Sequence, residues 1–324
     1  MQLFRYRDGL IPNSCAIGYI IVAYPLALAG LASPVGILYF LCIFLLAHSL
    51  VIAAYLVHEC VHGTVFRSVN MNRYLGESLV WLCGTSYVPY ELIRHKHLRH
   101  HADRVDVVQV DYRTFLSHHP YVRQGLQALQ WCHLPAMEIL THLLSMTAPF
   151  FLESRRHQRR RVVLVFISRT IFFLFLAWIN PMILPAYLAA YLLFMWVLGF
   201  MDAFQHSYEV RYALDGEKIP VEFDREYEEG HTFSNLISGR FHWINLLVLN
   251  FCYHNVHHNR SGEPWYRLPH LHEERYAGTG VQEIALPDQL ARYQRYRVGR
   301  VMQDLELESG PGIGAAGVSF LVGV

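Results

Sequence analysis

Nine histidines in four short segments are the residues of this 324-residue chain best suited to chemistry. Three of the segments read H-E-C-V-H, H-L-R-H-H and H-N-V-H-H, and the fourth holds a single histidine. The nine are His58, His62, His97, His100, His101, His206, His254, His257 and His258. A buried imidazole needs a partner for each ring nitrogen, so nine of them are hard to explain as core filling. A site with more than one metal ion supplies these partners.

The spacing inside each segment suits metal ligation. His58 and His62 are four residues apart, which puts both rings on one face of a helix. His97 and His101 repeat this spacing, and the third cluster has the same shape. Adjacent histidines within the second and third clusters point to different sides of a helix. We therefore expect them to serve two neighbouring ions.

A carboxylate joins the single histidine at the end of the last apolar segment. Asp202 and His206 are four residues apart, so we expect them to lie one helical turn apart. Leaving polar groups unpaired at a membrane edge costs free energy, so we take this pair as a candidate functional site. Three roles are open to Asp202: it can bind a metal directly, bind one through water, or orient a ligand ring. We expect one of the last two roles, and Asp202 is the only catalytic residue predicted.

Two other classes of protein compete with a dinuclear redox site. The letters from His58 to His62 match the H-E-x-x-H of a zinc protease, but one zinc ion would leave seven histidines idle. Such a hydrolase would work without oxygen or reductant. A metal transporter needs polar ligands near the bilayer midplane, where this chain is nearly bare. Imidazole binds iron, zinc, copper and nickel, so spacing alone does not choose the metal.

The elements that carry these residues are predicted to be membrane helices. The chain is 53% hydrophobic and 16% charged, and residues 13–57 contain no Lys, Arg, Asp or Glu. This run is long enough for roughly two spans of about 20 residues each. Four spans are predicted, at residues 14–32, 35–57, 162–179 and 182–204. Short turns join them in pairs, so we expect an all-α integral membrane protein built from two helical hairpins.

Basic residues predict the orientation. They precede the first span, follow the second and lead into the third, whereas the two short turns carry none. By the positive-inside rule, both termini, the middle segment and all the histidine clusters are expected on the cytoplasmic side. Arg169 interrupts the third span, and we expect its long side chain to reach the inner interface.

The rest of the single catalytic domain is expected at or outside the membrane surface. Residues 75–87, 126–151 and 241–253 are apolar but interrupted, so they are predicted to be interfacial or re-entrant helices. Residues 207–306 are expected to form a cytoplasmic cap, and residues 307–324 a flexible tail. The six cysteines form no C-x-x-C pair and are expected to be free thiols. A net charge of +1 gives no reason to expect nucleic acid.

The motifs resemble those of the membrane-bound fatty acid desaturase and hydroxylase superfamily. The similarity runs from about the second span to residue 272. It comprises H-E-C-V-H-G from His58, P-Y-x-x-x-R-x-x-H-x-x-H-H from Pro89, Asp202-x-x-x-His206, and Y-H-N-V-H-H from Tyr253 followed by P-W-Y-R-L-P. This resemblance implies a di-iron centre held by all nine histidines. Some members have Asn at the place of Asp202, where it binds through water.

The resemblance also implies the reaction and its partners. Two iron ions and dioxygen would oxidise a fatty acyl chain, with desaturation as the leading expectation and hydroxylation or oxidative decarboxylation of a free fatty acid to a terminal alkene as alternatives. The chain contains neither the H-P-G-G of a cytochrome b5 domain nor a cysteine cluster. Electrons are therefore expected from a separate ferredoxin, rubredoxin or cytochrome b5 system. The membrane is expected to be a bacterial inner membrane or the endoplasmic reticulum.

Overall fold

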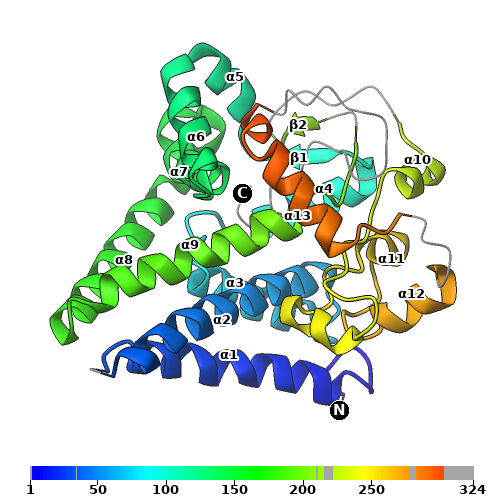
Figure 1. The fold of residues 1–324 in the computed structure, drawn as a ribbon, viewed down its shortest axis with the longest axis horizontal. Coiled ribbons are helices and arrows are strands. Elements are labelled where there is room, and N and C mark those ends of the chain that lie inside the picture. Colours follow the sequence, from blue (N-terminus) through cyan, green and yellow to red (C-terminus); the bar gives the residue numbers. More distant parts are fainter. Residues whose placement is uncertain (1, 34, 209–210, 215–221, 277–281, 303–324) are drawn as a thin grey trace.

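The fold is almost entirely helical and has four helices that are long and apolar enough to cross a membrane. The computed structural model describes residues 2–33, 35–208, 211–214, 222–276 and 282–302 (Figure 1). Within these residues the only sheet is a pair of short parallel strands. The predicted all-α membrane fold is confirmed. The tail expected at residues 307–324 lies outside the described residues.

The four long helices form two pairs. They are α1 (Leu10–Gly30), α2 (Gly36–His62), α8 (Arg159–Ile179) and α9 (Ile183–Met201). Each overlaps one predicted span. In the turn between α8 and α9, the Asn180 side chain accepts a hydrogen bond from the backbone N–H of Met182 at 3.0 Å. This local bond allows the chain to reverse within a few residues.

Helix α2 is the centre of the helical bundle. It packs against both α1 and α9 (Figure 1). In its apolar stretch of 18 residues 50% of the residues are buried, compared with 17% in the corresponding stretch of the helix that ends at Ile179. Large apolar side chains on α1 and α8, such as Ile21 and Phe166, are exposed. Because a bilayer covers such surfaces, α8 is the span with the most lipid-facing side chains.

Shorter helices follow the predicted interrupted segments. Residues 75–87 fall largely on α3 (Val69–Leu82), and residues 126–151 divide between α6 (Pro120–Trp131) and α7 (Ala136–Phe151). The 3₁₀ helix η2 (His242–Val248) lies in the third predicted segment. Helix α5 (Tyr112–His118) precedes α6, and Asp111 caps it by accepting the N–H of Thr114 at 3.0 Å.

The polar elements gather at one end of the long helices (Figure 1). This region contains strands β1 (Asp106–Val108) and β2 (Arg211–Ala213), which pair with Asp106 opposite Arg211. It also contains α4 (Tyr90–Asp103), α10 (Arg225–Gly230), α11 (His254–Asn259), α12 (Leu268–Tyr276) and α13 (Leu286–Tyr296). The remaining 3₁₀ helices are η1 (Glu153–Gln158) and η3 (Gly299–Val301).

Arg169 departs from its sequence expectation. Its Nε and Nη2 atoms are buried and have no hydrogen-bond partner. The residue is ten positions from the first residue of α8, roughly 15 Å along the helix axis. The prediction that its side chain reaches the inner interface is therefore wrong, because neighbouring helices enclose the guanidinium within the span.

Candidate metal centre

All nine predicted ligand histidines come together in two adjacent groups. The group of five comprises His58, His62, His97, His101 and His257, and the group of four comprises His100, His206, His254 and His258. Within each group, one nitrogen of every ring lies within 4.8 Å of the corresponding nitrogen of every other ring. The rings come from the end of α2, from α4, from the segment after α9 and from α11. Asp202 belongs to neither group.

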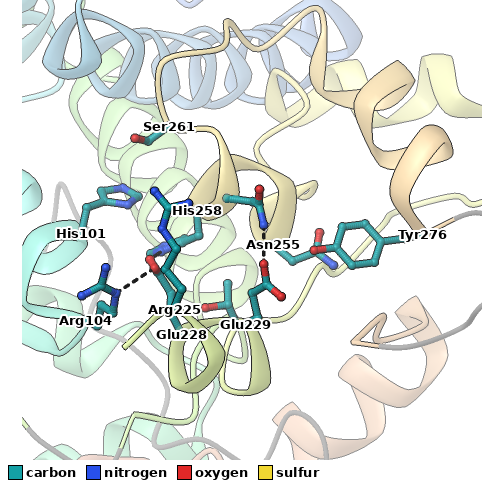
Figure 2. Close-up of a pocket in the computed structure, with 11 residues that line it drawn as sticks. His101, Arg104, Arg225, Glu228, Glu229, Asn255, His258, Ser261 and Tyr276 are labelled. Carbon is teal, nitrogen blue, oxygen red and sulfur yellow. Dashed lines mark hydrogen bonds and ion pairs between the residues drawn. The ribbon is translucent and has the colours of Figure 1, made fainter. Parts of the chain in front are cut away.

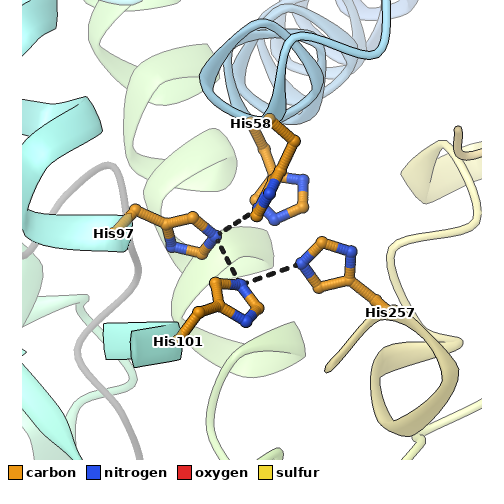
Figure 3. Close-up of side chains that lie close together, drawn as sticks. His58, His97, His101 and His257 are labelled. Carbon is orange, nitrogen blue, oxygen red and sulfur yellow. Dashed lines mark hydrogen bonds between the residues drawn. The ribbon is translucent and has the colours of Figure 1, made fainter. Parts of the chain in front are cut away.

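Four rings of the group of five, those of His58, His97, His101 and His257, lie close together in Figure 3. The Nε2 of His97 lies 2.9 Å from that of His62 and 3.1 Å from that of His101. The Nε2 of His257 lies 3.1 Å from that of His101. These atoms come from helices distant in sequence, so tertiary packing brings them to one point.

The group of four converges in the same way. The Nε2 of His206 lies 2.9 Å from the Nε2 atoms of both His254 and His258. The ring of His100 completes the group, with its centroid 4.5 Å from that of His206. The two groups adjoin where the centroids of His101 and His258 lie 4.2 Å apart.

The helix geometry separates adjacent histidines. His100 and His101 fall in different groups, as do His257 and His258. Helix α2 ends immediately after His62, because Gly63 adopts a left-handed conformation with φ of 68°. In this cap the N–H of Thr64 donates to the carbonyl of Glu59 at 3.1 Å. The cap keeps His58 and His62 on the final two turns of a regular helix.

His206 does not lie on a helix with Asp202. Helix α9 ends at Met201, and His206 forms an isolated antiparallel bridge with Thr232. The helical placement predicted from the four-residue spacing is wrong. The reason is a distant contact, since the Asn235 side chain donates to the carbonyl of Met201 at 2.5 Å and occupies one of the last acceptors of the helix.

The protonation state of the rings is suited to binding metal ions. Burial holds the pKa of His97, His101, His206, His254 and His257 well below the usual value, and repulsion by neighbouring imidazoles adds to this effect. The rings are therefore neutral near pH 7. A neutral imidazole has one N–H and one lone pair, and the lone pair is the metal ligand. Converging neutral Nε2 atoms suit a cation in each group.

Hydrogen bonds at Nδ1 fix the orientation of two rings. His100 donates through Nδ1 to the carbonyl of Val105 at 2.7 Å, since a carbonyl can only accept. The Nδ1 of His258 lies 2.9 Å from Oε1 of Glu228. Each contact leaves Nε2 with its lone pair directed into the group of four.

Glu228 is a site residue that the sequence did not reveal. Its other oxygen accepts from Nε of Arg104 at 3.1 Å, and burial raises the pKa of its carboxyl. It also lies within ligand distance of His101 and His258. In the sequence it is one of several acidic residues between Glu222 and Glu229. Thirty residues separate Glu228 from His258, so no local spacing could have linked them.

A polar cavity of about 180 Å³ borders this contact (Figure 2). His101 and His258 form part of its wall, so the cavity adjoins both histidine groups. The other labelled wall residues in Figure 2 are Arg104, Arg225, Glu228, Glu229, Asn255, Ser261 and Tyr276. The site therefore has an apolar side formed by the spans and a polar side formed by α10 and α11.

Asp202 and a buried lysine lie near the same end of α9. Asp202 is 5% exposed and Lys96 is 3% exposed. Burial lowers the pKa of Lys96 to about 7, and the charges of Asp202 and Asp106 oppose that shift. Asp106 also lies near the group of four, with Oδ1 4.0 Å from Nδ1 of His206. Sequence reasoning singled out neither Lys96 nor Asp106.

Glu59 does not have the surroundings of a zinc protease base. Its Oε2 accepts a hydrogen bond from the Thr64 hydroxyl at 2.6 Å and another from the backbone N–H of Trp265 at 3.1 Å. This carboxylate holds the cap of α2 against the segment before α12. In addition, His58 and His62 share their group with three further histidines.

The other histidines lie outside both groups within the described part of the chain. His48 contacts the Tyr19 hydroxyl at 2.5 Å, and His272 contacts Glu283 at 2.8 Å. His142 packs against Tyr87. All six cysteines are free thiols. The histidine contacts are those of packing and polar pairing.

Comparison with known proteins gives one family. The family model described as fatty acid desaturase matches residues 34–286, which is well over half of the chain and includes both histidine groups. No curated protein matches the chain.

Proposed function

The chain belongs to the fatty acid desaturase family, and on this basis we propose that it oxidises a fatty acyl chain with dioxygen at a pair of iron ions. The observation that carries the proposal is the pair of adjacent histidine groups. Neutral imidazole is a ligand that iron accepts. We assign all nine histidines as ligands, with one ion in the group of five and one in the group of four.

Bound iron would supply the reductive activation of dioxygen needed to remove hydrogen from an unactivated C–H bond, which no side chain can perform. The protein residues hold and orient the ligands. The Val105 carbonyl and Glu228 direct the Nε2 atoms of His100 and His258 inward. Burial of the site excludes water from the reacting groups.

Asp202 is proposed to act on this site without direct ligation. It is buried at the end of α9 but outside both histidine groups. A carboxylate in this position can hold a water molecule or orient a ring. We expect Asp202→Asn to retain more acyl oxidation than Asp202→Ala, since Asn keeps a polar side chain that can bind water. Equal loss in both variants would exclude this role.

Desaturation is the proposed outcome at the acyl chain. Hydroxylation and oxidative decarboxylation of a free fatty acid begin with oxidation by the same type of metal site, so they are the alternative outcomes. Electrons are proposed to come from a separate ferredoxin, rubredoxin or cytochrome b5 system. The apolar helices next to the histidines are suited to holding an alkyl chain.

Product analysis tests the reaction. Lipids and headspace volatiles from cells producing the wild type are compared by mass spectrometry with those from cells producing His254→Ala. A new unsaturated acyl chain made only by the wild type is the expected result. A shortened terminal alkene would establish decarboxylation, and a hydroxylated chain with no new double bond would establish hydroxylation. No oxidised product in either strain would overturn the proposal.

A further inference from the structure

The short helix η2 carries a patch of exposed apolar side chains outside the four spans. Trp243 is 70% exposed, and Phe241, Leu246 and Leu247 are each 45% to 50% exposed. Single apolar side chains on a surface are ordinary, but several within one short segment form a patch that marks an interaction site. Figure 1 shows this segment in yellow beside α2, against which it packs. The patch is therefore suited to an apolar partner.

A hydrogen bond attaches η2 to the middle of a spanning helix. The carbonyl of Leu247 lies 3.2 Å from Nε2 of His48 in α2. Because a carbonyl only accepts, Nε2 donates, and Nδ1 of the neutral ring accepts from the hydroxyl of Tyr19 in α1 at 2.5 Å. His48 is nine residues before Val57, the end of the charge-free run, which is roughly 14 Å along the helix axis. Half of the hydrocarbon core of a bilayer is about 15 Å thick, so this contact lies deep in the apolar layer.

The segment supplies hydrogen-bond partners for its own backbone. Asn245 is fully buried, and its Oδ1 accepts the N–H of Ser238 at 3.1 Å. Its Nδ2 donates to the carbonyl of Ser238 at 3.0 Å and to the hydroxyl of Tyr253 at 2.9 Å. The Ser238 hydroxyl in turn accepts the N–H of Phe241 at 2.9 Å. Irregular backbone at membrane depth must be hydrogen-bonded within the protein, and these bonds meet that requirement for the entry to η2.

The same segment leads into the third histidine cluster. Leu249 and Asn250 both adopt the left-handed conformation, with φ of 49° and 57°, and turn the chain back. Phe251 follows, and its ring centroid lies 4.9 Å from that of His58. His254, the first ligand of α11, comes three residues later. Whatever holds η2 in place therefore also fixes the start of the segment that carries this cluster.

We propose that η2 re-enters the bilayer and inserts into its acyl chains, and that the hydrogen bond from His48 to Leu247 holds it at that depth. The side chains in contact with lipid are Phe241, Trp243, Leu246 and Leu247. The sequence predicted either an interfacial or a re-entrant segment here, and the contact with the middle of α2 favours re-entry. Lipid chains are the partner that also covers α1 and α2 at this depth. The inference concerns lipid contact alone, so it does not depend on the metal or the reaction.

A nitroxide spin label at position 243 tests the insertion. The full-length protein carries Trp243→Cys together with Cys15→Ala and Cys132→Ala, which remove both exposed thiols, and is placed in phosphatidylcholine vesicles. Collisions of the label with oxygen, which concentrates in hydrocarbon, are compared with collisions with a nickel chelate, which stays in water. We expect this label to collide mainly with oxygen. A label at Glu226→Cys, an exposed position of α10, should collide mainly with the chelate.

Two results would overturn the insertion. One is equal access of the nickel chelate to the labels at positions 243 and 226, which would place η2 in water. The other is the loss of both kinds of collision at position 243, which would show that protein, such as a second copy of the chain, covers the segment.

Variants of His48 test what holds the segment at its depth. His48→Ala removes the donor to the Leu247 carbonyl, whereas His48→Gln keeps a side-chain N–H. We expect the oxygen preference of the label at position 243 to fall in His48→Ala and to be retained in His48→Gln. His270→Ala, at an exposed position of α12, is the control. If His48→Ala does not fold, Tyr19→Phe removes the hydroxyl that orients the ring. An unchanged oxygen preference in the folded variant would overturn the role of His48.

Discussion

Each histidine of the centre has two nitrogens with different tasks. In His258, Nε2 faces the group of four, while Nδ1 contacts Glu228 at 2.9 Å. In His100, Nδ1 is occupied by the Val105 carbonyl at 2.7 Å. The partners at Nδ1 decide which nitrogen is free for a metal and how the ring is turned. Residues outside the histidine boxes therefore contribute to the metal affinity.

Glu228 should have a measurable effect on iron retention. Replacing Glu228 by Ala removes the acceptor at Nδ1 of His258 and the partner of Arg104. We expect the iron affinity to fall by about 10- to 100-fold, and Glu228→Gln to retain more of it. Iron remaining after dialysis against a graded chelator measures the effect. Glu226→Gln, at an exposed position of the same helix, is the control. Wild-type iron retention in Glu228→Ala would contradict the assigned role.

Acidification should weaken both metal binding and stability. The pKa values of His97, His101 and His206 are held below the ordinary value by burial. The unfolded chain therefore binds more protons than the folded chain once the pH falls below about 6.5, so stability decreases toward acid. Protonated rings cannot bind iron, and iron release should follow the same direction.

Iron content and the thermal unfolding midpoint, measured from pH 7.5 to pH 5.5, check this expectation. The iron-free protein should also lose stability over this range, because the linkage depends on the rings themselves. Constant stability of the iron-free protein across the range would show that the histidines do not remain neutral on folding.

At the scale of helices, the positions of the histidines depend on where each helix ends. Gly63 stops α2 one residue after His62 with a φ of 68°. Its Cβ position has open space around it, so a substitution there tests backbone conformation without a steric clash. Helix α2 places His58 and His62 in the group of five. If its last turn frayed, the positions of both histidines would become less well defined.

Gly63→Ala should therefore destabilise the protein by roughly 1 kcal/mol, the cost of placing a residue with a Cβ in the left-handed region. Gly18→Ala is the matched control, since Gly18 is in the middle of α1 and also has open space around it. Alanine is the better helix former, so this control should be neutral or stabilising. Thermal unfolding of the three proteins compares them. If Gly18→Ala lowered the thermal stability as much as Gly63→Ala, the prediction would be contradicted.

The sequence predicts best those elements that depend on residues close together in the chain. The four spans follow from long runs of apolar residues, and the helices carrying His58 and His97 follow from the spacing of their histidines. His206 was placed wrongly on a helix because Asn235, far along the chain, takes part in ending α9 at Met201. Glu228 was missed because its contact with His258 depends on tertiary packing.

The whole molecule separates an apolar half from a polar half. The histidine groups lie at one end of the long helices, and the charged residue midway along α8 is the cation Arg169. A pathway for metal cations across the membrane would need ligands or anions near the midplane. The distribution of charge thus favours chemistry at the membrane surface over metal transport.

The cytoplasmic location of the polar half remains a prediction of the positive-inside rule. Cys132 is an exposed thiol at the end of α6, whereas the turn at Asn180 lies at the opposite end of α8 from Arg159. In a Cys15→Ala background, we expect an impermeant maleimide to label Cys132 only after the cells are opened. Asn180→Cys, with Cys132 also replaced, should be labelled in intact cells. The reverse pattern would invert the orientation.

The central claim is a dinuclear iron site formed by nine histidines. The most direct measurement is metal analysis of the purified protein, with His257→Ala and His206→Ala representing the group of five and the group of four. About two irons per wild-type chain are predicted, one for each group, with less iron in both variants. One metal per chain, zinc in place of iron, or iron unaffected by either substitution would contradict the claim.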